Sequence, residues 1–229
     1  MIKIEHEVMP SPEQLEFVIE GMRNPMNSWS NSDSYPFEDD DGFDSFKVGA
    51  NDYQLMRKLS KAGNDHRKFM RMLPVYARIT APLYWWKEFD TYKVGTVANS
   101  CSTMHKIAEK EFTSLDFSDD RLFNGIEKEH VYDQNGRDIT MAPNELLGHV
   151  ICHLNIYRKL YLETKHKGYW WQMIQLLPSS YNQTRNVMMN YEVLANIYKS
   201  RKNHKLDEWI EFCEWIKEID RYDIICDDR

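Results

Sequence analysis

The sequence predicts a helix-dominated α+β domain with a small antiparallel or mixed sheet. Apolar residues recur at helical spacing along most of the chain, whereas strand patterns are confined to residues 2–8 and 75–79. No segment repeats at a fixed period. The chain has 229 residues, of which 42% are hydrophobic and 13% aromatic, with only 9 Gly and 8 Pro. This composition is typical of a packed globular protein, so we expect a single domain over residues 1–229.

The N-terminal part is expected to contain one strand, one helix and a long loop. Residues 2–8 alternate apolar and polar side chains, as a half-buried strand does. A helix should follow from Pro12 to about Met22, because Ser11 is a suitable N-cap. Residues 23–50 combine turn-forming residues with an acidic run and are expected to form a loop. The acids lack the spacing of a calcium-binding loop, so we interpret them as solvated surface.

The middle of the chain is expected to contain a helix from Asn51 or Asp52 to Gly63, a short helix at 65–71, a strand at 75–79 and a helix at 83–90 opened by Pro82. An irregular loop at 91–103, a helix from Ser102 or Thr103 and a polar connection at 116–142 should follow. The last part of the chain is expected to form helices at 143–165, 170–178, 186–201 and 206–219. The helix at 143–165 has a broad apolar face. Such a helix is buried, often against a partner chain.

Charge and hydropathy exclude several classes of partner. The chain has 29 Lys and Arg against 36 Asp and Glu, a formal net charge of −7. A broad nucleic-acid surface needs many cationic contacts, so no nucleic-acid partner is expected. The apolar stretch at 81–86 is far too short to span a membrane, and the N-terminus lacks a signal pattern. We therefore expect a cytoplasmic protein without membrane contact.

Known catalytic motifs are missing, and the cysteine and histidine patterns are weak. The sequence contains no G-x-G-x-x-G, P-loop, H-E-x-x-H or G-x-S-x-G motif and no C-x-x-C pair. His149 and His153 share a helix face with no acidic ligand, so no metal is expected. Cys101 is the best candidate nucleophile, since Lys93 and a possible helix N-terminus would lower the pKa of its thiol. The alternative is an inert, half-buried cysteine.

The C-terminal third contains Leu177-Pro178, Asn190, Asn196, Arg201 and His204 in that order. This order resembles the C-terminal signature of flavin-dependent thymidylate synthases, in which a Leu-Pro precedes a helix with two asparagines and a Leu-Arg end, followed by a turn with a histidine.

Three upstream blocks fall in the order of the same family. Residues 80–84, Thr-Ala-Pro-Leu-Tyr, resemble the family's Lys-Ala-Pro-Ile-Phe entry into the helix that carries its arginine-rich motif. Gly63 and His66 precede the strand, as in the family, and Arg23 with residues 27–29 resembles its early Arg-x-Ser-Phe. Each block is short, and the shared order carries the resemblance.

The family's hallmark, R-H-R-x-x-S-x-N-E-x-S-x-R, falls on residues 91–103 and is largely replaced. Lys93 stands for an Arg and Thr96 for a Ser, while Asn99 replaces the Glu and Cys101 the second Ser. Only one cationic position remains of three. Because arginine binds phosphate bidentately and lysine as a point charge, the phosphate grip must be weakened or rebuilt.

The resemblance implies a set of site residues. It implies FAD contacts by His66, Asn190, Asn196 and Lys93, nucleotide binding and a catalytic role for Arg201, a substrate loop with Thr96, Asn99, Ser100 and Ser102, and a thiol beside the pyrimidine at Cys101. Another interpretation treats the asparagines as polar residues of a helix face and Arg201 as a partner of the helix dipole.

The resemblance also implies an activity: conversion of dUMP to dTMP with FAD, NADPH and methylenetetrahydrofolate, in a homotetramer whose sites lie between subunits. A related base modification of another deoxynucleotide is left open by the eroded hallmark. Two alternatives remain. One is a catalytically inactive homologue that binds a nucleotide or a protein partner, and the other is an unrelated helical interaction protein whose Trp85-Trp86 and Trp170-Trp171 pairs are core or interface anchors.

Overall fold

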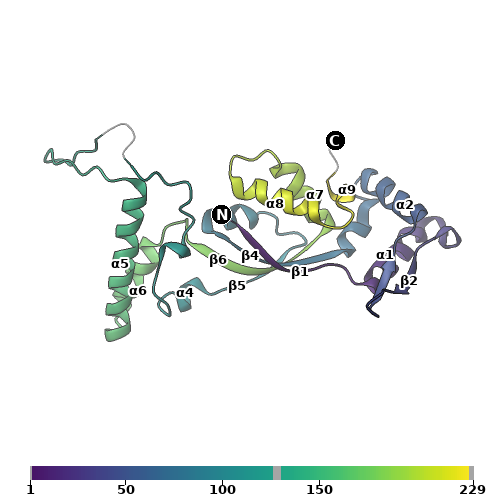
Figure 1. Cartoon of the computed structure of the whole chain (residues 1–229), viewed down its shortest axis with the longest axis horizontal. Helices are drawn as coiled ribbons and strands as arrows, with labels where there is room; N and C mark the ends of the chain where they lie inside the picture. The colour runs from purple at the N-terminus through teal and green to yellow at the C-terminus, as the bar shows by residue number, and fades with distance from the viewer. Residues whose placement is uncertain (1, 126–129, 227–229) are drawn as a thin grey trace. The chain divides into compact units, whose positions relative to one another are not determined.

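The computed structural model describes residues 2–125 and 130–226 and has the predicted α+β architecture (Figure 1). A four-stranded sheet has the order β1 (Lys3–Val8), β4 (Pro74–Pro82), β6 (Asn182–Asn190) and β5 (Val97–Ser100). A separate antiparallel hairpin pairs β2 (Tyr35–Glu38) with β3 (Asp44–Lys47).

Helices account for most of the regular structure. The α-helices are α1 (Pro12–Arg23), α2 (Ala50–Lys61), α3 (Leu83–Phe89), α4 (Thr103–Lys106), α5 (Pro143–Thr164), α6 (Lys167–Leu176), α7 (Tyr191–Arg201), α8 (Asp207–Glu218) and α9 (Tyr222–Ile225). The 3-10 helices are η1 (Asn24–Met26), η2 (Trp29–Asn31), η3 (Arg67–Met72) and η4 (Ser114–Asp116).

The chain divides into two compact units. The larger unit contains Ile2–Ile79, Glu88–Asn99 and the residues from Arg185 onward, and the smaller unit contains Thr80–Lys87 and Ser100–Thr184. The single domain over residues 1–229 therefore stays a prediction.

In the larger unit, helices α7 and α8 cover one face of the sheet (Figure 1). Alternation along β4 turns Val75, Ala77 and Ile79 toward these helices, where each is at most 3% exposed. Trp209 and Phe212 of α8 are fully buried in this layer. The sheet is therefore covered by helices on the face that carries its buried apolar residues, and the opposite face carries a mixture of polar and apolar residues.

The smaller unit has its own hydrophobic core between α5 and α6. Its fully buried members include Leu154 and Met173. Asn155 ties the preceding loop to α5, since its amide donates to the Phe112 carbonyl at 2.8 Å and accepts from the Phe112 amide at 2.9 Å. On α5, Leu147 and Leu154 are buried, whereas Leu146 and Ile156 are about half exposed. The apolar face of α5 is thus only partly covered within the chain.

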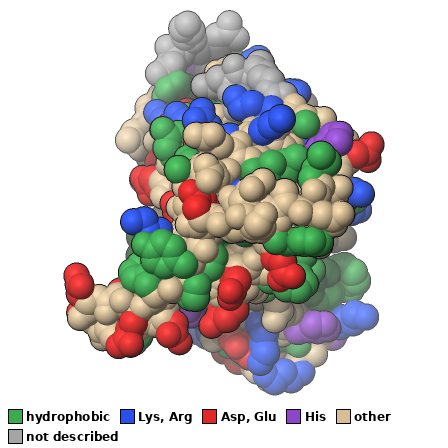
Figure 2. Space-filling model, turned by 90° about the vertical axis from the view of Figure 1, so that its right-hand side faces the viewer, with side chains coloured by type: hydrophobic (Ala, Val, Ile, Leu, Met, Phe, Trp, Pro, Cys, Tyr) green, Lys and Arg blue, Asp and Glu red, His purple; other side chains and the backbone are tan. Residues whose placement is uncertain are grey.

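The loop predicted at 23–50 is wrong over its central part, which forms the β2–β3 hairpin. Tyr35 pairs with Lys47 and Glu38 with Asp44, and the acidic run lies at the turn. Gly42 in this turn has a φ of +82°, a conformation that glycine adopts without strain. Figure 2 faces the side on which α1, α2 and β2 lie in Figure 1, and shows Asp and Glu side chains grouped beside apolar ones.

Two strands replace predicted loop and helix. Strand β5 lies within the expected loop at 91–103, and all four of its residues are exposed, so no alternation marks it in the sequence. The helix expected from Asn186 begins only at Tyr191, because residues 182–190 form β6. Polar and apolar residues do not alternate regularly along β6, so the sequence does not indicate a strand there. Asn190 is therefore the N-cap of α7 rather than a residue of a helix face.

Smaller differences concern element ends. The strand predicted at 75–79 extends over β4, so that Pro82 ends a strand and α3 starts at Leu83. The helix expected at 65–71 is the 3-10 helix η3. The helix expected at 170–178 starts earlier, at Lys167. Within the connection at 116–142, residues 126–129 lie outside the described part of the chain.

Candidate functional site

In the larger unit, the start of α7 packs against the loop that follows α3. The Asn190 side chain is 7% exposed and its Oδ1 accepts a hydrogen bond from the Val193 amide at 3.0 Å, which caps the helix. Gly95 has a φ of +86°, and a Cβ there would lie 2.8 Å from Nδ2 of Asn190. Only glycine fits this approach. The loop that carries the eroded hallmark therefore contacts Asn190, the first asparagine of the C-terminal signature.

At the other end of α7, Arg201 is bound by residues of its own chain. Its Nη1 donates to Oε2 of Glu88 at 2.6 Å, and its Nε donates to the Tyr92 hydroxyl at 3.0 Å. Its guanidinium lies 4.8 Å from the ring centroid of Trp209, whose Nε1 donates to the same Glu88 oxygen at 3.0 Å. The charge of Arg201 is thus neutralised and stacked within the larger unit.

A small basic concavity lies where α7 meets η3 and the end of α2. Its volume is about 150 Å³, and its polar lining is Ser60, Lys61, Gly63, Arg67, Asn196 and Lys199. Glu192 holds the two elements together, since its carboxylate accepts from Arg67 Nε at 3.0 Å and from Arg71 Nε at 2.8 Å. Within the described residues, the Lys199 ammonium has no hydrogen bond or ion pair, which leaves its charge available for an anion.

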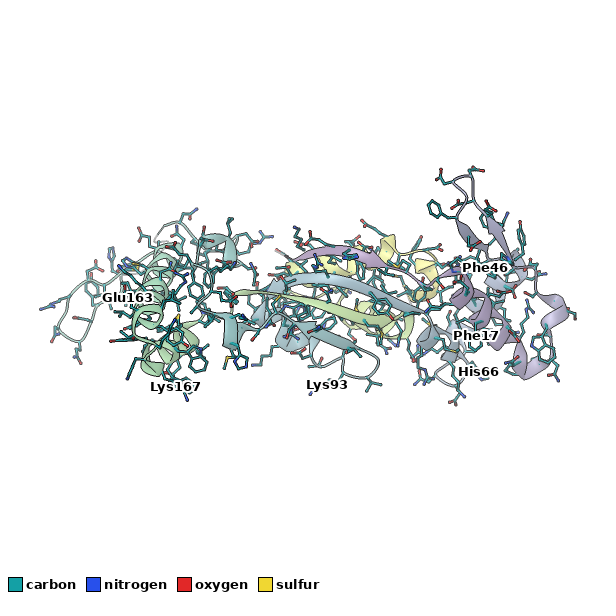
Figure 3. The ribbon with its side chains drawn as sticks, turned by 90° about the horizontal axis from the view of Figure 1, so that it is seen from below. Phe17, Phe46, His66, Lys93, Glu163 and Lys167 are labelled. Atoms are coloured by element: carbon teal, nitrogen blue, oxygen red, sulfur yellow. The ribbon has the colours of Figure 1, made fainter. Side chains whose placement is uncertain are left out.

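This concavity has the donor set that the diphosphate of FAD would need. Lys61, Arg67 and Lys199 supply positive charge, and the Asn196 amide supplies a donor and an acceptor. Its volume suits the anionic part of the cofactor but not the whole dinucleotide. His66, exposed at the start of η3, is next to Arg67 in the sequence (Figure 3). The two expected cofactor residues His66 and Asn196 thus belong to elements in mutual contact.

The other expected residues in the larger unit have different surroundings. Lys93 is exposed in the loop after α3 (Figure 3). The Thr96 hydroxyl donates to the Tyr92 carbonyl at 2.7 Å, which fixes the shape of this loop. Asn99 lies on β5 and is exposed.

Ser100, Cys101 and Ser102 belong to the smaller unit. Cys101 is exposed. Its backbone amide donates to the Thr184 carbonyl at 3.0 Å, and its carbonyl accepts from the side-chain amide of Gln183 at 3.1 Å. The Ser102 hydroxyl accepts from the His105 amide at 3.2 Å and caps α4. The thiol is therefore held accessible, directly before a short helix.

Sequence reasoning missed all three cations of the basic concavity, Lys61, Arg67 and Lys199. The signal was present, because Lys199 follows Asn196 by three residues and lies on the same face of α7. Lys61 ends α2, a helix whose position the sequence did predict.

The structure gives no independent indication of a metal site. The described residues contain no group of three or more His, Cys, Asp and Glu side chains that could bind a metal ion. Nδ1 of His153 lies 2.8 Å from the His149 carbonyl, one turn earlier in α5. None of the helices in the described ranges is long and apolar enough for a membrane span.

No protein-family model matches the sequence, and no curated protein is similar to it in sequence. Solved structures are similar in fold. Thymidylate synthase X from Helicobacter pylori, with FAD and dUMP, superposes with a TM-score of 0.60 at 15% identity over 95% of this chain and 91% of that one. A second structure of the flavin-dependent thymidylate synthase from Helicobacter pylori, complexed with FAD and dUMP, gives 0.58 at 14% identity over 95% and 92%.

A third similar structure is a UMP/dUMP methylase from Streptomyces cacaoi bound with 5-bromo-UMP, with a TM-score of 0.56 at 12% identity over 95% of this chain and 88% of that one. All three cover nearly the whole of both chains, which excludes the alternative of an unrelated helical fold. The chain has the fold of the flavin-dependent thymidylate synthases, as the order of its short motifs predicted.

Proposed function

We propose that the chain is a flavin-dependent enzyme that modifies the base of a pyrimidine deoxynucleotide. The reaction is the methylation of dUMP to dTMP with methylenetetrahydrofolate and NADPH, or a related base modification. The observation that carries this proposal is the basic concavity at α7 and η3, where cationic side chains gather beside Asn196. Structures of the same fold contain FAD and dUMP, which supports the same ligand classes here.

In this proposal the chain's own residues hold the cofactor by charge. Lys61, Arg67 and Lys199 neutralise the diphosphate, Asn196 exchanges hydrogen bonds with it, and His66 lies against the ring system. Arg67 is oriented by Glu192, whose carboxylate accepts from its Nε at 3.0 Å. FAD, when bound, supplies the redox chemistry.

Thr96, Asn99, Ser100 and Ser102 are proposed to contact the nucleotide, and Lys93 is proposed to contact FAD. The four nucleotide positions carry hydroxyl and amide groups and no cation, so they provide hydrogen bonds rather than strong binding of the phosphate. Arg201 is proposed to support the site by holding α3 against α7, because its guanidinium is already hydrogen-bonded to Glu88 and Tyr92.

Cys101 is proposed as the nucleophile. Its thiolate forms a bond to C6 of the pyrimidine, and the electron pair of the C5–C6 double bond moves toward C5 and O4. C5 would then attack the methylene carbon of methylenetetrahydrofolate, and the bond from that carbon to folate N10 would break with its electron pair left on N10. Loss of the C5 proton would restore the C5–C6 double bond and expel the thiolate. The methylene would become a methyl group when its remaining bond to folate N5 breaks and is replaced by a hydride equivalent, which FAD reduced by NADPH would supply. The exposure of Cys101 supports this role. Full turnover by Cys101→Ala would remove it.

We further propose assembly into a homo-oligomer, a tetramer by resemblance. The partly exposed apolar residues of α5, Leu146 and Ile156, favour a partner on this helix. Sedimentation of the purified protein tests this assembly, and a monomer at micromolar concentration would contradict it.

The test of the main proposal is the visible absorption spectrum of the purified protein, with mass spectrometry of any ligand released on denaturation. We expect flavin bands and FAD. Lys199→Gln should weaken FAD binding, whereas Lys217→Gln, the same change on the exposed face of α8, should not. A colourless protein that ignores added FAD would overturn the proposal.

One observation favours a second candidate, a catalytically inactive homologue that keeps the fold and binds a nucleotide or a protein. The guanidinium of Arg201, which the resemblance assigns to the nucleotide, is satisfied by Glu88 and Tyr92. Nucleotide binding without flavin and without turnover would support this candidate.

A further inference from the structure

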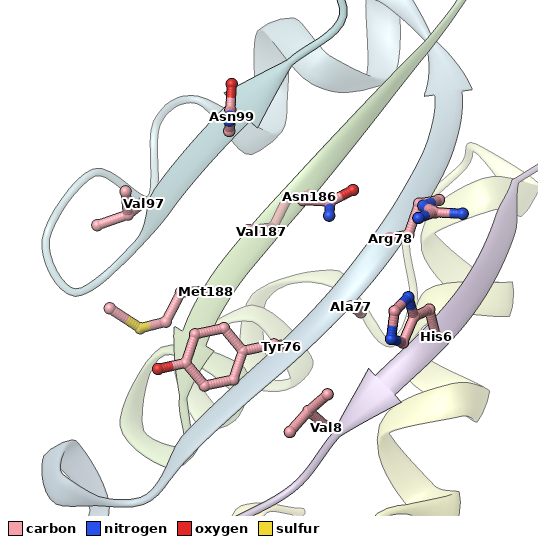
Figure 4. A pocket seen from close by; sticks show the side chains of 10 residues that line it. All are labelled: His6, Val8, Tyr76, Ala77, Arg78, Val97, Asn99, Asn186, Val187 and Met188. Carbon is pink, nitrogen blue, oxygen red and sulfur yellow. The ribbon is translucent and has the colours of Figure 1, made fainter.

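The sheet of the larger unit has an open groove on the face away from α7 and α8 (Figure 4). The alternation that buries Val75, Ala77 and Ile79 turns Tyr76 and Arg78 to this face. The groove has a volume of about 450 Å³, within the range of small-molecule sites. Its lining is His6, Val8, Tyr76, Ala77, Arg78, Val97, Asn99, Asn186, Val187 and Met188.

Charged, aromatic and amide side chains lie in different parts of the groove. Arg78 and His6 lie together at one side, Tyr76 lies next to Met188 at one end, and the Asn186 amide lies between these groups (Figure 4). The floor is apolar. The groove thus offers positive charge, an aromatic and thioether surface, and a side-chain amide within a single small volume.

Four polar side chains line the groove: His6, Arg78, Asn99 and Asn186. Within residues 2–125 and 130–226, none of them has a hydrogen-bond or ion-pair partner. Elsewhere in the larger unit, arginines are paired with carboxylates, such as Arg23 with Asp52 and Arg185 with Asp90. Arg78 therefore keeps a complete guanidinium fork for an external acceptor.

The backbone at His6 deviates from a regular strand. Its φ is +51°, a left-handed conformation that is uncommon for a residue other than glycine. Such strained positions cluster at ligand sites. The deviation interrupts the alternation of β1 and accompanies the position of the imidazole beside Arg78 (Figure 4).

We infer that this groove binds a nucleoside monophosphate, with Arg78 and His6 on the phosphate, Tyr76 and Met188 on the ring, and Asn186 and Asn99 on its polar edge. A guanidinium fork matches phosphate oxygens, and a primary amide matches the alternating donors and acceptors of an imide edge. The identity of the nucleotide as a pyrimidine rests on the proposed function.

The test is calorimetric titration of the full chain with UMP, dUMP and uridine. We expect Arg78→Gln to weaken binding of both monophosphates at least tenfold and to leave the weaker binding of uridine nearly unchanged. Arg78→Lys should recover part of the affinity. Arg137→Gln is the matched control, since Arg137 is exposed in the smaller unit. Thermal unfolding of each variant checks that it folds.

Three results would overturn the inference: no binding of either monophosphate by the wild type, equal affinity in Arg78→Gln, or an Arg78→Gln variant that dissociates into smaller oligomers with its nucleotide affinity intact. The last result would make the groove a contact between copies. The flavin spectrum is measured on the same samples. Loss of monophosphate affinity in a colourless protein would support the groove and count against the flavin proposal, so the two can fail separately.

Discussion

The Arg201 guanidinium forms an ion pair of 2.6 Å with the Glu88 carboxylate, which also accepts from the Trp209 indole. This pair joins the last residue of α7 to the end of α3 and so fixes the contact between the two segments that carry the family resemblance. An arginine so engaged holds structure together at the site, and a nucleotide that took its place on Arg201 would have to displace Glu88.

Glu88→Ala should therefore destabilise the protein. It removes the carboxylate oxygen that accepts from both Arg201 Nη1 and the Trp209 indole, at a cost of about 1–3 kcal/mol. The free energy of unfolding in urea measures this. Asp90→Ala is the control, because Asp90 pairs with Arg185 at 2.7 Å but is half exposed, so the loss there is at most about 1 kcal/mol. Equal losses in the two variants would contradict the structural role of Glu88.

The sequence predicted the segments that meet at the site but not their contacts. The shared order of the C-terminal signature and the three upstream blocks predicted the fold, although each block is short. The hydrogen bonds from Arg201 to Glu88 and Tyr92 depend on how α3 and α7 pack. No local sequence pattern predicts this packing. Helix positions were predictable because apolar spacing and caps are local signals.

Strands were the main failure, for a physical reason. A strand is visible in a sequence when one face is apolar and the other polar. Strand β5 is exposed on both faces, and the open face of β6 mixes Asn186 with Met188. The groove on that face was missed for the same cause, since only Asn99 of its lining was expected to bind a ligand.

Two variants of Asn190 can separate its role as the N-cap of α7 from a contact with the cofactor. Asn190→Ala removes the bond to the Val193 amide and should lower stability by about 1 kcal/mol. Asn190→Asp keeps an oxygen at the cap and should retain most of the stability. If Asn190→Asp unfolds like the wild type but binds FAD more weakly, Asn190 also contacts the cofactor. Chemical unfolding and flavin titration of both variants give the answer.

Gly95→Ala should disturb the contact between the α3–β5 loop and α7. The new Cβ would lie 2.8 Å from Asn190 Nδ2 and 3.0 Å from Val193 Cγ2, at a φ of +86°. Gly136→Ala is the matched control, because its φ is +74° and a Cβ there meets nothing within 4 Å. Backbone strain of about 1–3 kcal/mol is common to both variants. A larger loss at Gly95 in thermal unfolding reports the crowding, and equal losses would exclude it.

Thiol reactivity should separate Cys101 from Cys213. Cys213 is 2% exposed, and burial raises the pKa of its thiol to about 11. Cys101 and Cys152 are exposed. Iodoacetamide at mildly alkaline pH should label these two in the folded protein and Cys213 only after unfolding, because the thiolate is the reactive form. Peptide mass mapping shows the labelled sites. Rapid labelling of Cys213 in the folded protein would contradict its burial.

The carboxylate of Asp52 should make stability depend on pH in the acid range. Asp52 is fully buried and accepts from Arg23 Nε at 2.6 Å and from Ser32 at 2.7 Å. Burial raises its pKa, but hydrogen bonds from Ser34, Ser32 and Arg23, with the Arg23 charge, outweigh this and hold the pKa below its ordinary 3.8. A lowered folded-state pKa contributes stability above the unfolded-state value, and this is lost as the pH falls through the folded-state pKa.

Asp52→Asn should therefore lose about 3–5 kcal/mol at pH 7, because it leaves the buried Arg23 without a counter-charge. As the pH falls below about 4, protonation removes the same charge from the wild type, and the difference between the two proteins should shrink. Urea unfolding from pH 7 to pH 3 measures both curves. Glu214→Gln, which breaks the exposed pair with Lys217, should change stability by less than about 1 kcal/mol at either pH. A difference between wild type and Asp52→Asn that stays constant across this range would show that the Asp52 charge contributes nothing to the folded state.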